Sequence, residues 1–287
     1  MKIHSIPMGL FTNCFLVEGD QGALLVDAGF PNHETHFYKA LQRLGIRPGD
    51  VQLIVVTHGH ADHVGSLKAV KGQTRANVAI HQEDSHLLRH GLVKVPPPVT
   101  VWGRFLVRVL RAFSFLGRFE PVEPEIVLEG ELSLEEFGIR GKIIPTPGHT
   151  PGSVSVLLEN GEAFVGDLVV NAFPMSMGLG IPAVAENVRE IYASWEKILS
   201  AGARIIYPAH GKPFPADHLN RKLPAVGGQL SGESRKRRIR ARGLLTVSRR
   251  TCWCFCHSQR SGKLTAVFSL SETLPEWGHD PRVFQIL

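Results

Sequence analysis

The sequence predicts a mixed α/β domain, and three observations support this fold class. Short apolar runs alternate with amphipathic segments of helical period over residues 1–222. Side chains of the types that bind metals follow directly after several of these runs. The composition, with 43% hydrophobic and 20% charged residues, is that of an ordinary globular protein, and 287 residues suffice for one large domain or for one domain with an appendage.

Short runs rich in β-branched and apolar residues predict the strands. The chain reads as strands from residue 2 to residue 29, with a hairpin-like turn at residues 19–22. Within and after this region, strands are expected at residues 13–18, 23–26, 52–56, 77–81, 125–128, 139–144, 153–158, 163–165 and 204–207.

Amphipathic segments predict the helices. Asn32 is expected to cap a helix that runs to about Leu44 and stops at Gly45. Residues 186–200 carry an apolar stripe at helical spacing, and Gly202 follows their end. Two shorter helices are expected at about residues 62–71 and 82–90.

Residues 91–120 are expected to be an insertion. Three prolines at residues 96–98 interrupt the pattern, and apolar residues then recur at helical spacing with arginines on another face. We interpret the segment as a helix packed on the domain or at a contact between two copies in a homodimer. A lid over the substrate pocket and a helix that lies on a membrane surface are the alternatives.

The net charge of +6 comes from the C-terminal segment. Residues 1–222 contain 21 Lys and Arg against 22 Asp and Glu, whereas residues 223–287 contain 11 against 4. We therefore expect a catalytic domain over residues 1–222, with no nucleic-acid partner, and a basic tail of low order over 223–287. The tail, with its basic run at 234–240, is interpreted as a segment without an evolved fold, such as the product of a shifted reading frame. The alternative is an arm that binds nucleic acid or another acidic surface.

Cysteine usage and hydropathy argue against a disulfide-rich, a membrane-spanning or an exported protein. Cys14 is the only cysteine among the first 222 residues, so no disulfide framework is expected there. The cluster at residues 252–257, C-x-C-x-C-H, does not have the usual pair spacing of a metal site. The sequence contains no apolar run of about 18 residues, so no membrane span is expected. The first 20 residues lack the pattern of a signal peptide, so a cytoplasmic location is expected.

Seven side chains of metal-binding type follow strands or lie in adjoining loops. Four of them fall within six residues after the strand at 52–56, where a loop can turn several side chains toward one point. Such a cluster has little structural use, because it exposes polar groups that only a metal or water can satisfy. The seven residues are His58, His60, Asp62, His63, His149, Asp167 and His210.

The motif His58-Gly-His60-Ala-Asp62-His63, followed in order by His149, Asp167 and His210, closely resembles the metallo-β-lactamase superfamily over about residues 1–215. The resemblance implies a four-layer αββα sandwich with the site at one edge of its two sheets. It implies that Asp167 bridges two metal ions and that Asp27 orients a ligand histidine. The implied ligands are His58, His60 and His149 for the first ion, and Asp62, His63 and His210 for the second.

A ligand set of nitrogen and oxygen atoms suits zinc, iron or manganese. Two divalent zinc ions are expected, because His58-x-His60 carries histidine where flavodiiron relatives carry glutamate. A hydroxide between two such ions can exist near neutral pH and attack a carbonyl carbon or phosphorus. Asp62 would be the catalytic residue that holds this hydroxide and passes on a proton.

The resemblance implies a metallo-hydrolase that acts on a small molecule, with thioesters, as in glyoxalase II, or lactones as the expected substrates. The C-terminal segment does not resemble the glutathione-binding region of glyoxalase II. One alternative is a sulfur dioxygenase with a single iron, and a less favoured one is a nuclease or phosphodiesterase. Residues 91–120 and 171–185 are expected to line the pocket, where Phe173, Met175, Met177 and Leu179 would suit an apolar acyl group.

Overall fold

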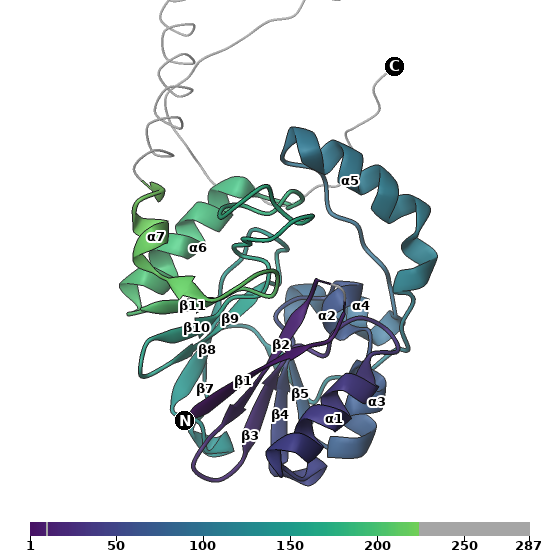
Figure 1. Cartoon of the computed structure of the whole chain (residues 1–287), viewed down its shortest axis with the longest axis vertical. Coiled ribbons are helices and arrows are strands. Elements are labelled where there is room, and N and C mark those ends of the chain that lie inside the picture. The colour runs from purple at the N-terminus through teal and green to yellow at the C-terminus, as the bar shows by residue number, and fades with distance from the viewer. Residues whose placement is uncertain (10, 224–287) are drawn as a thin grey trace, which may run out of the picture. The chain divides into compact units, whose positions relative to one another are not determined.

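The computed structural model describes residues 1–9 and 11–223, which form two six-stranded sheets between outer helices (Figure 1). The α/β class and the four-layer αββα arrangement are therefore confirmed. Within the described residues, no helix is long and apolar enough to cross a membrane. The predictions for the tail beyond Leu223, including the basic run and the cysteine cluster, lie outside the described residues.

The first sheet is built from the N-terminal half of the chain. Its first three strands pair antiparallel, and its third to sixth strands pair parallel. In spatial order the strands are β1 (Lys2–Pro7), β2 (Asn13–Glu18), β3 (Ala23–Val26), β4 (Val51–Val55), β5 (Asn77–His81) and β6 (Ile126–Leu128).

The second sheet follows in sequence and packs against the first. All of its pairs are antiparallel except β10 with β11. In spatial order its strands are β7 (Leu132–Ser133), β8 (Gly141–Pro145), β9 (Val154–Leu158), β10 (Glu162–Phe164), β11 (Ile205–Tyr207) and β12 (Phe214–Pro215).

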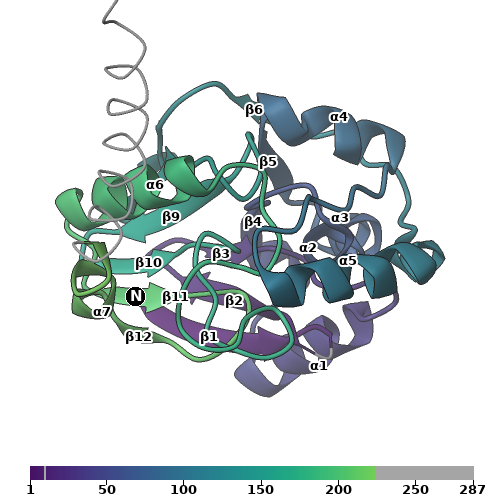
Figure 2. The ribbon, with the colours of Figure 1, turned by 90° about the horizontal axis from the view of Figure 1, so that it is seen from above.

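Helices cover the outer face of each sheet, as the view from above shows (Figure 2). The first sheet is covered by α1 (Glu34–Leu44), α3 (Leu67–Thr74) and α4 (Gln82–His90), and the second by α6 (Val188–Ser200) and α7 (Asp217–Asn220). The remaining helical segments are α2 (Ala61–Val64), α5 (Val101–Ala112), and the short 3₁₀ turns η1 (Pro48–Asp50), η2 (Ser114–Gly117) and η3 (Glu135–Phe137).

Strand β3 shows why its sequence is apolar at every position. Leu24 and Val26 lie in the core between the two sheets, whereas Ala23 and Leu25 lie in the core beneath the helices. Alternate side chains of a strand point to opposite faces, and here both faces are buried.

The prediction of one continuous helix over residues 62–71 is wrong, because α2 and α3 are two separate helices. Between them, the Gly65 amide donates to the Gly29 carbonyl at 2.8 Å, and the Ser66 hydroxyl donates to the Phe30 carbonyl at 2.7 Å. A Cβ atom at Gly65 would collide with Pro31. The chain bends here because it packs closely on the loop after β3.

The expected cap of α1 is also wrong. Asn32 adopts a left-handed conformation, with φ of 63°, and His33 occupies the capping position before Glu34. The predicted end is confirmed, because Gly45 follows Leu44 with φ of 69° and its amide donates to the carbonyl of Gln42.

Candidate metal centre

The strands of both sheets deliver the candidate ligands to one edge of the sandwich. His58 lies three residues after the end of β4, and Asp62 and His63 lie in the single turn of α2. In the second sheet, His149 lies in the loop between β8 and β9, and the other two ligands follow β10 and β11. The structure thus brings together all seven residues that the sequence singled out: His58, His60, Asp62, His63, His149, Asp167 and His210.

Six of the seven side chains form two separate groups, and a third group, His58, His63 and Asp167, shares one histidine with each of them. One ring nitrogen each of His58, His60 and His149 lies within 4.8 Å of the others, and the same limit holds for one atom each of Asp62, His63 and His210. These sets coincide with the two ligand sets that the family resemblance implies.

Asp167 lies between the two groups. Its Oδ1 atom is 3.2 Å from Nε2 of His210 and 3.5 Å from Nε2 of His63. Its Oδ2 atom is 3.6 Å from Nε2 of His149. Each carboxylate oxygen therefore faces a different group.

Several buried polar atoms face one another without a hydrogen-bond partner. They are Nε2 of His58, His60, His63 and His210, together with Oδ1 of Asp167. A buried polar atom without a partner costs about 1–3 kcal/mol, so a cluster of five is improbable in a site that binds nothing. Imidazole nitrogens and a carboxylate are the ligands that a divalent transition metal takes, and the donor set fits such ions.

Hydrogen bonds at Nδ1 fix the rings of three of the five candidate histidine ligands. His63 Nδ1 donates to Asp27 Oδ2 at 2.8 Å, His149 Nδ1 to the Val184 carbonyl at 3.1 Å, and His210 Nδ1 to the Phe11 carbonyl at 2.8 Å. Because Nδ1 carries the proton, Nε2 of each ring is left to face the centre.

Asp27 is itself held firmly. Its carboxylate also accepts hydrogen bonds from the amide and the hydroxyl of Thr57, both at 2.8 Å. Thr57 directly precedes His58, and its hydroxyl lies 3.1 Å from Nδ1 of that residue. Asp27 therefore contacts His63 directly and positions His58 through Thr57.

The histidines of the centre fall into two sets by their pKa values, which are lowered in one set and raised in the other. Burial lowers the pKa of His58 well below its ordinary value and lowers the pKa values of His60 and His149 to about 4. Burial acts the same way on His210 and His63, but the carboxylates around them outweigh it. They raise the pKa of His210 to about 10 and that of His63 well above its ordinary value.

The carboxylates respond in the opposite direction. Burial alone would raise the pKa of Asp62 and Asp167, but His63 and His210 lower both well below the usual range. The Asp62 side chain is 24% exposed, whereas the side chains of His63 and His210 are fully buried. Asp62 is thus ionised and reaches the solvent side of the centre.

Asp84 is a positioning residue that the sequence analysis missed. This buried carboxylate on α4 accepts hydrogen bonds at Oδ2 from the Gly59 amide at 2.9 Å and from the Thr150 hydroxyl at 2.8 Å. It therefore ties the loop that carries His58 and His60 to the loop that carries His149. One signal was available, since Asp84 shares the buried face of a helix with Leu87 and Leu88.

Residues 97–99, in the segment before α5, are joined to the candidate centre through residues 183–185. Pro98 forms a β-bridge with Val184, the Val99 amide donates to the Ala183 carbonyl, and the Ala185 amide donates to the Pro97 carbonyl. The Val184 carbonyl is the group that orients His149. After α5, Gly117 packs against Ala61, which lies between His60 and Asp62.

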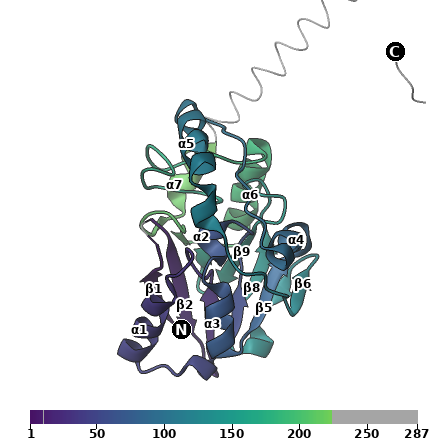
Figure 3. The same cartoon turned by 90° about the vertical axis from the view of Figure 1, so that its right-hand side faces the viewer.

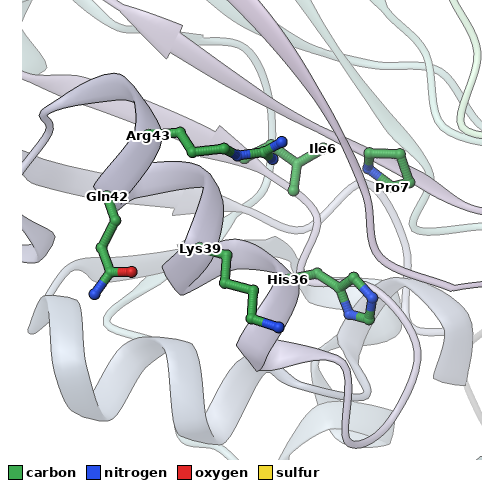
Figure 4. A pocket seen from close by; sticks show the side chains of 6 residues that line it. All are labelled: Ile6, Pro7, His36, Lys39, Gln42 and Arg43. Carbon is green, nitrogen blue, oxygen red and sulfur yellow. The ribbon is translucent and has the colours of Figure 1, made fainter.

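A surface hollow lies elsewhere, between α1 and β1 (Figure 4). It has a volume of about 650 Å³, and its lining residues are Ile6, Pro7, His36, Lys39, Gln42 and Arg43. The polar side chains among them are exposed, unlike the buried and unpartnered atoms of the metal centre. We therefore assign the chemistry to the metal centre.

A family model described as the metallo-beta-lactamase superfamily matches residues 7–210. The chain therefore belongs to the metallo-beta-lactamase superfamily, as its motif predicted. It carries a cluster of histidines and aspartates that could hold metal ions.

Relatives among known proteins agree with this family. The chain is 32% identical over 195 residues to the uncharacterized protein YobT of Bacillus subtilis, a match that covers 64% of this chain and 72% of that one. It is 26% identical over 171 residues to the probable metallo-hydrolase YqgX of the same organism, covering 59% and 72% of the two chains.

Solved structures share the fold. The metallo-beta-lactamase family protein TTHA1429 from Thermus thermophilus superposes with a TM-score of 0.59 at 21% identity, covering 80% of this chain and 79% of that one. The protein TTHA1623, solved in a di-iron-bound form, superposes with a TM-score of 0.54 at 26% identity, covering 75% and 95%.

Proposed function

We propose that the protein is a hydrolase that uses two divalent metal ions to cleave a small ester-type substrate, either a thioester or a lactone. The observation that carries this proposal is the pair of ligand groups on either side of Asp167, with five buried atoms that lack partners. His58, His60 and His149 would hold one ion, Asp62, His63 and His210 the other, and Asp167 both. The proposed catalytic domain covers residues 1–222, which include the span matched by the family model.

Two such ions supply Lewis acidity and lower the pKa of a bound water toward neutrality. The residues of the chain would transfer protons and hold the histidine rings in position. Asp62, partly exposed at the centre, would accept a proton from the attacking water and return it to the leaving thiol or alcohol. Asp27 and the Val184 and Phe11 carbonyls keep the ring nitrogens of three histidines aimed at the centre, so that little rearrangement is needed during the reaction.

A second hollow supports an apolar acyl group in the substrate. It has a volume of about 530 Å³ and lies between α5 and the loop after β10, with Trp102, Met177, Leu179 and Ile181 in its lining. Ala183 also lines it, one residue before the carbonyl that orients His149.

Metal content is the first test of the proposal. Zinc is expected, but TTHA1623 in its di-iron-bound form supports iron as an alternative occupant of this fold. We expect about two metal ions per chain by elemental analysis of the full-length protein, together with hydrolysis of thioesters or lactones. About one iron per chain, with oxygen uptake in the presence of a persulfide, would instead favour the sulfur dioxygenase.

Substitution of the bridging residue tests the site itself. Asp167→Ala is expected to abolish hydrolysis and to lower the metal content, because one carboxylate serves both ligand groups. The matched control is Asp20→Ala, an exposed carboxylate in the hairpin turn, which should retain both properties. An active Asp167→Ala protein with its full metal content would contradict the proposed bridging role.

A further inference from the structure

Helix α5 lies on the outside of the domain (Figure 3) and carries a row of apolar side chains on its solvent side. Val101, Phe105 and Val109 are spaced four residues apart, so they lie along one face of the helix. Their side chains are 83%, 55% and 37% exposed. The exposed apolar surface continues past the end of the helix with Phe113, Phe115 and Leu116. We call these six residues the α5 apolar surface.

The opposite side of α5 accounts for the packing of the helix. Gly103, Leu106 and Val107 are buried against the domain. The helix is therefore apolar on two sides, and only the inner side is covered by the described part of the chain. A monomeric protein rarely exposes a contiguous apolar surface of this kind unless something binds there.

The α5 apolar surface is held in place by aromatic contacts. The ring of Trp102 lies 5.3 Å from that of Phe105 and 5.3 Å from that of Phe173, an exposed residue of the loop after β10. The indole Nε1 of Trp102 donates to the Pro174 carbonyl at 2.7 Å. The exposed row thus belongs to a packed helix that is anchored to a second segment.

Basic residues run beside the apolar row. Arg104, Arg108 and Arg111 are exposed and lie one or two positions from the apolar residues along the same helix. Residues 91–119 contain one lysine and four arginines but no aspartate or glutamate, and residues 171–185 contain no charged residue. The partner must therefore accept apolar side chains and cations side by side.

We propose that the α5 apolar surface docks the protein onto a lipid bilayer that is rich in anionic headgroups. Val101, Phe105 and Val109 would enter the boundary between headgroups and acyl chains, while the neighbouring arginines would contact lipid phosphates. Anchoring of this type takes an apolar face together with basic residues, and α5 supplies both.

Other occupants fit the surface less well. A second copy of the chain, docked symmetrically through α5, would bring two rows of arginines together. The C-terminal segment, residues 224–287, contains 11 Lys and Arg against 4 Asp and Glu, so like charge opposes its binding here. RNA would suit the arginines but would leave the exposed valines without apolar contacts.

Flotation with lipid vesicles tests the proposal on the full-length protein. We expect it to float with vesicles of phosphatidylcholine and phosphatidylserine, and much less with phosphatidylcholine alone. Phe105→Asp and Val109→Asp should each lower vesicle affinity at least ~10-fold, since a carboxylate would enter the interface. Arg104→Gln and Arg108→Gln should each lower it ~5-fold and weaken its salt dependence.

Two variants on α1 are matched controls. Leu44→Asp and Arg43→Gln alter an exposed apolar residue and an exposed arginine on a helix distant from α5 (Figure 1). Both should float like the unchanged protein. Circular dichroism, melting temperature and metal content of every variant should match the unchanged protein, so that a loss of flotation is not a loss of folding.

Four results would overturn the proposal. The first is that the unchanged protein does not float with either kind of vesicle. The second is that flotation survives Phe105→Asp, which would mean that it depends on other basic residues, such as the run at 234–240. The third is that the protein prefers RNA to vesicles in a competition experiment. The fourth is that the unchanged protein forms a dimer in sedimentation and does not float, and that Phe105→Asp abolishes this dimer.

Discussion

At the scale of single residues, two buried carboxylates hold the metal centre without facing it. Asp27 accepts hydrogen bonds from His63 and from both polar groups of Thr57. Asp84 accepts from Gly59 and Thr150 and thereby joins the loops that carry the histidines of one ligand group. Each residue fixes the backbone or the ring of a candidate ligand.

Removal of the Asp84 carboxylate should disturb one ligand group more than the other. In Asp84→Ala, the Gly59 amide and the Thr150 hydroxyl would lose their buried acceptor, at a cost of about 3 kcal/mol in the free energy of unfolding. We expect this loss in denaturant titrations, together with weaker binding of the ion held by His58, His60 and His149. Glu83→Ala, an exposed neighbour on α4, should change the free energy of unfolding by less than ~0.5 kcal/mol. Equal stability of the two variants would contradict the role of Asp84.

The sequence could indicate which side chains gather at the candidate centre, but it could not indicate Asp84, for a physical reason. His58, His60, Asp62 and His63 stand in a short motif whose spacing alone indicates metal binding. Asp84 contacts one residue 25 positions away and another 66 positions away. Its role depends on the rotation of α4 relative to two loops, which no local pattern reports.

At the scale of elements, α5 is held by close backbone packing as much as by its side chains. A Cβ atom at Gly103 would collide with the carbonyl oxygen of Ala183, the residue that bonds to Val99 and precedes Val184. A chain of contacts therefore runs from α5 through residues 183–185 to His149. A change in the packing of α5 has a direct route to the metal centre.

Two glycine substitutions should have opposite effects on stability. Gly103→Ala would force α5 away from residues 183–185 and is expected to lower the free energy of unfolding by about 1–3 kcal/mol. Gly72→Ala lies in α3, where an added Cβ atom would meet nothing within 4 Å, and should raise it by about 0.5–1 kcal/mol. Denaturant titration measures both values. A harmless Gly103→Ala would show that α5 is free to shift without strain.

Most elements could be predicted from periodicity, and the exceptions have local causes. Strands β2, β3 and β5 have the expected bounds because each is a compact apolar run. Strands β7 and β12 contain two residues each, which is too short for any pattern to appear. The break between α2 and α3 arises from packing on the loop after β3, a contact between distant residues that the helical period of 62–71 does not contain.

At the scale of the whole described molecule, the candidate metal centre draws its side chains from both sheets. His58, His60, Asp62 and His63 follow a strand of the first sheet, whereas His149, Asp167 and His210 follow strands of the second. Ions held between them would cross-link the two sheets at one edge, so that metal binding and the stability of the sandwich should depend on each other.

Chelation should therefore lower the melting temperature. At a free-ion concentration about 1,000 times the dissociation constant, binding to the folded state alone contributes about 4 kcal/mol. Complete removal of the ions should lower the melting temperature by roughly 10 °C, and the return of zinc should restore it. Calorimetry with elemental analysis of each sample measures both. An unchanged melting temperature in metal-free protein would show that the sheets do not depend on the ions.

The order of the ligands along the chain has a consequence for biosynthesis. A ribosome delivers the first four ligands early, yet neither ligand group is complete until its contribution from the second sheet has emerged. The first group must wait for His149 and the second for His210, near the end of the fold. Loading of the proposed second ion would thus be a late step in maturation, and a nascent chain that stops short of His210 would lack one member of that ligand group.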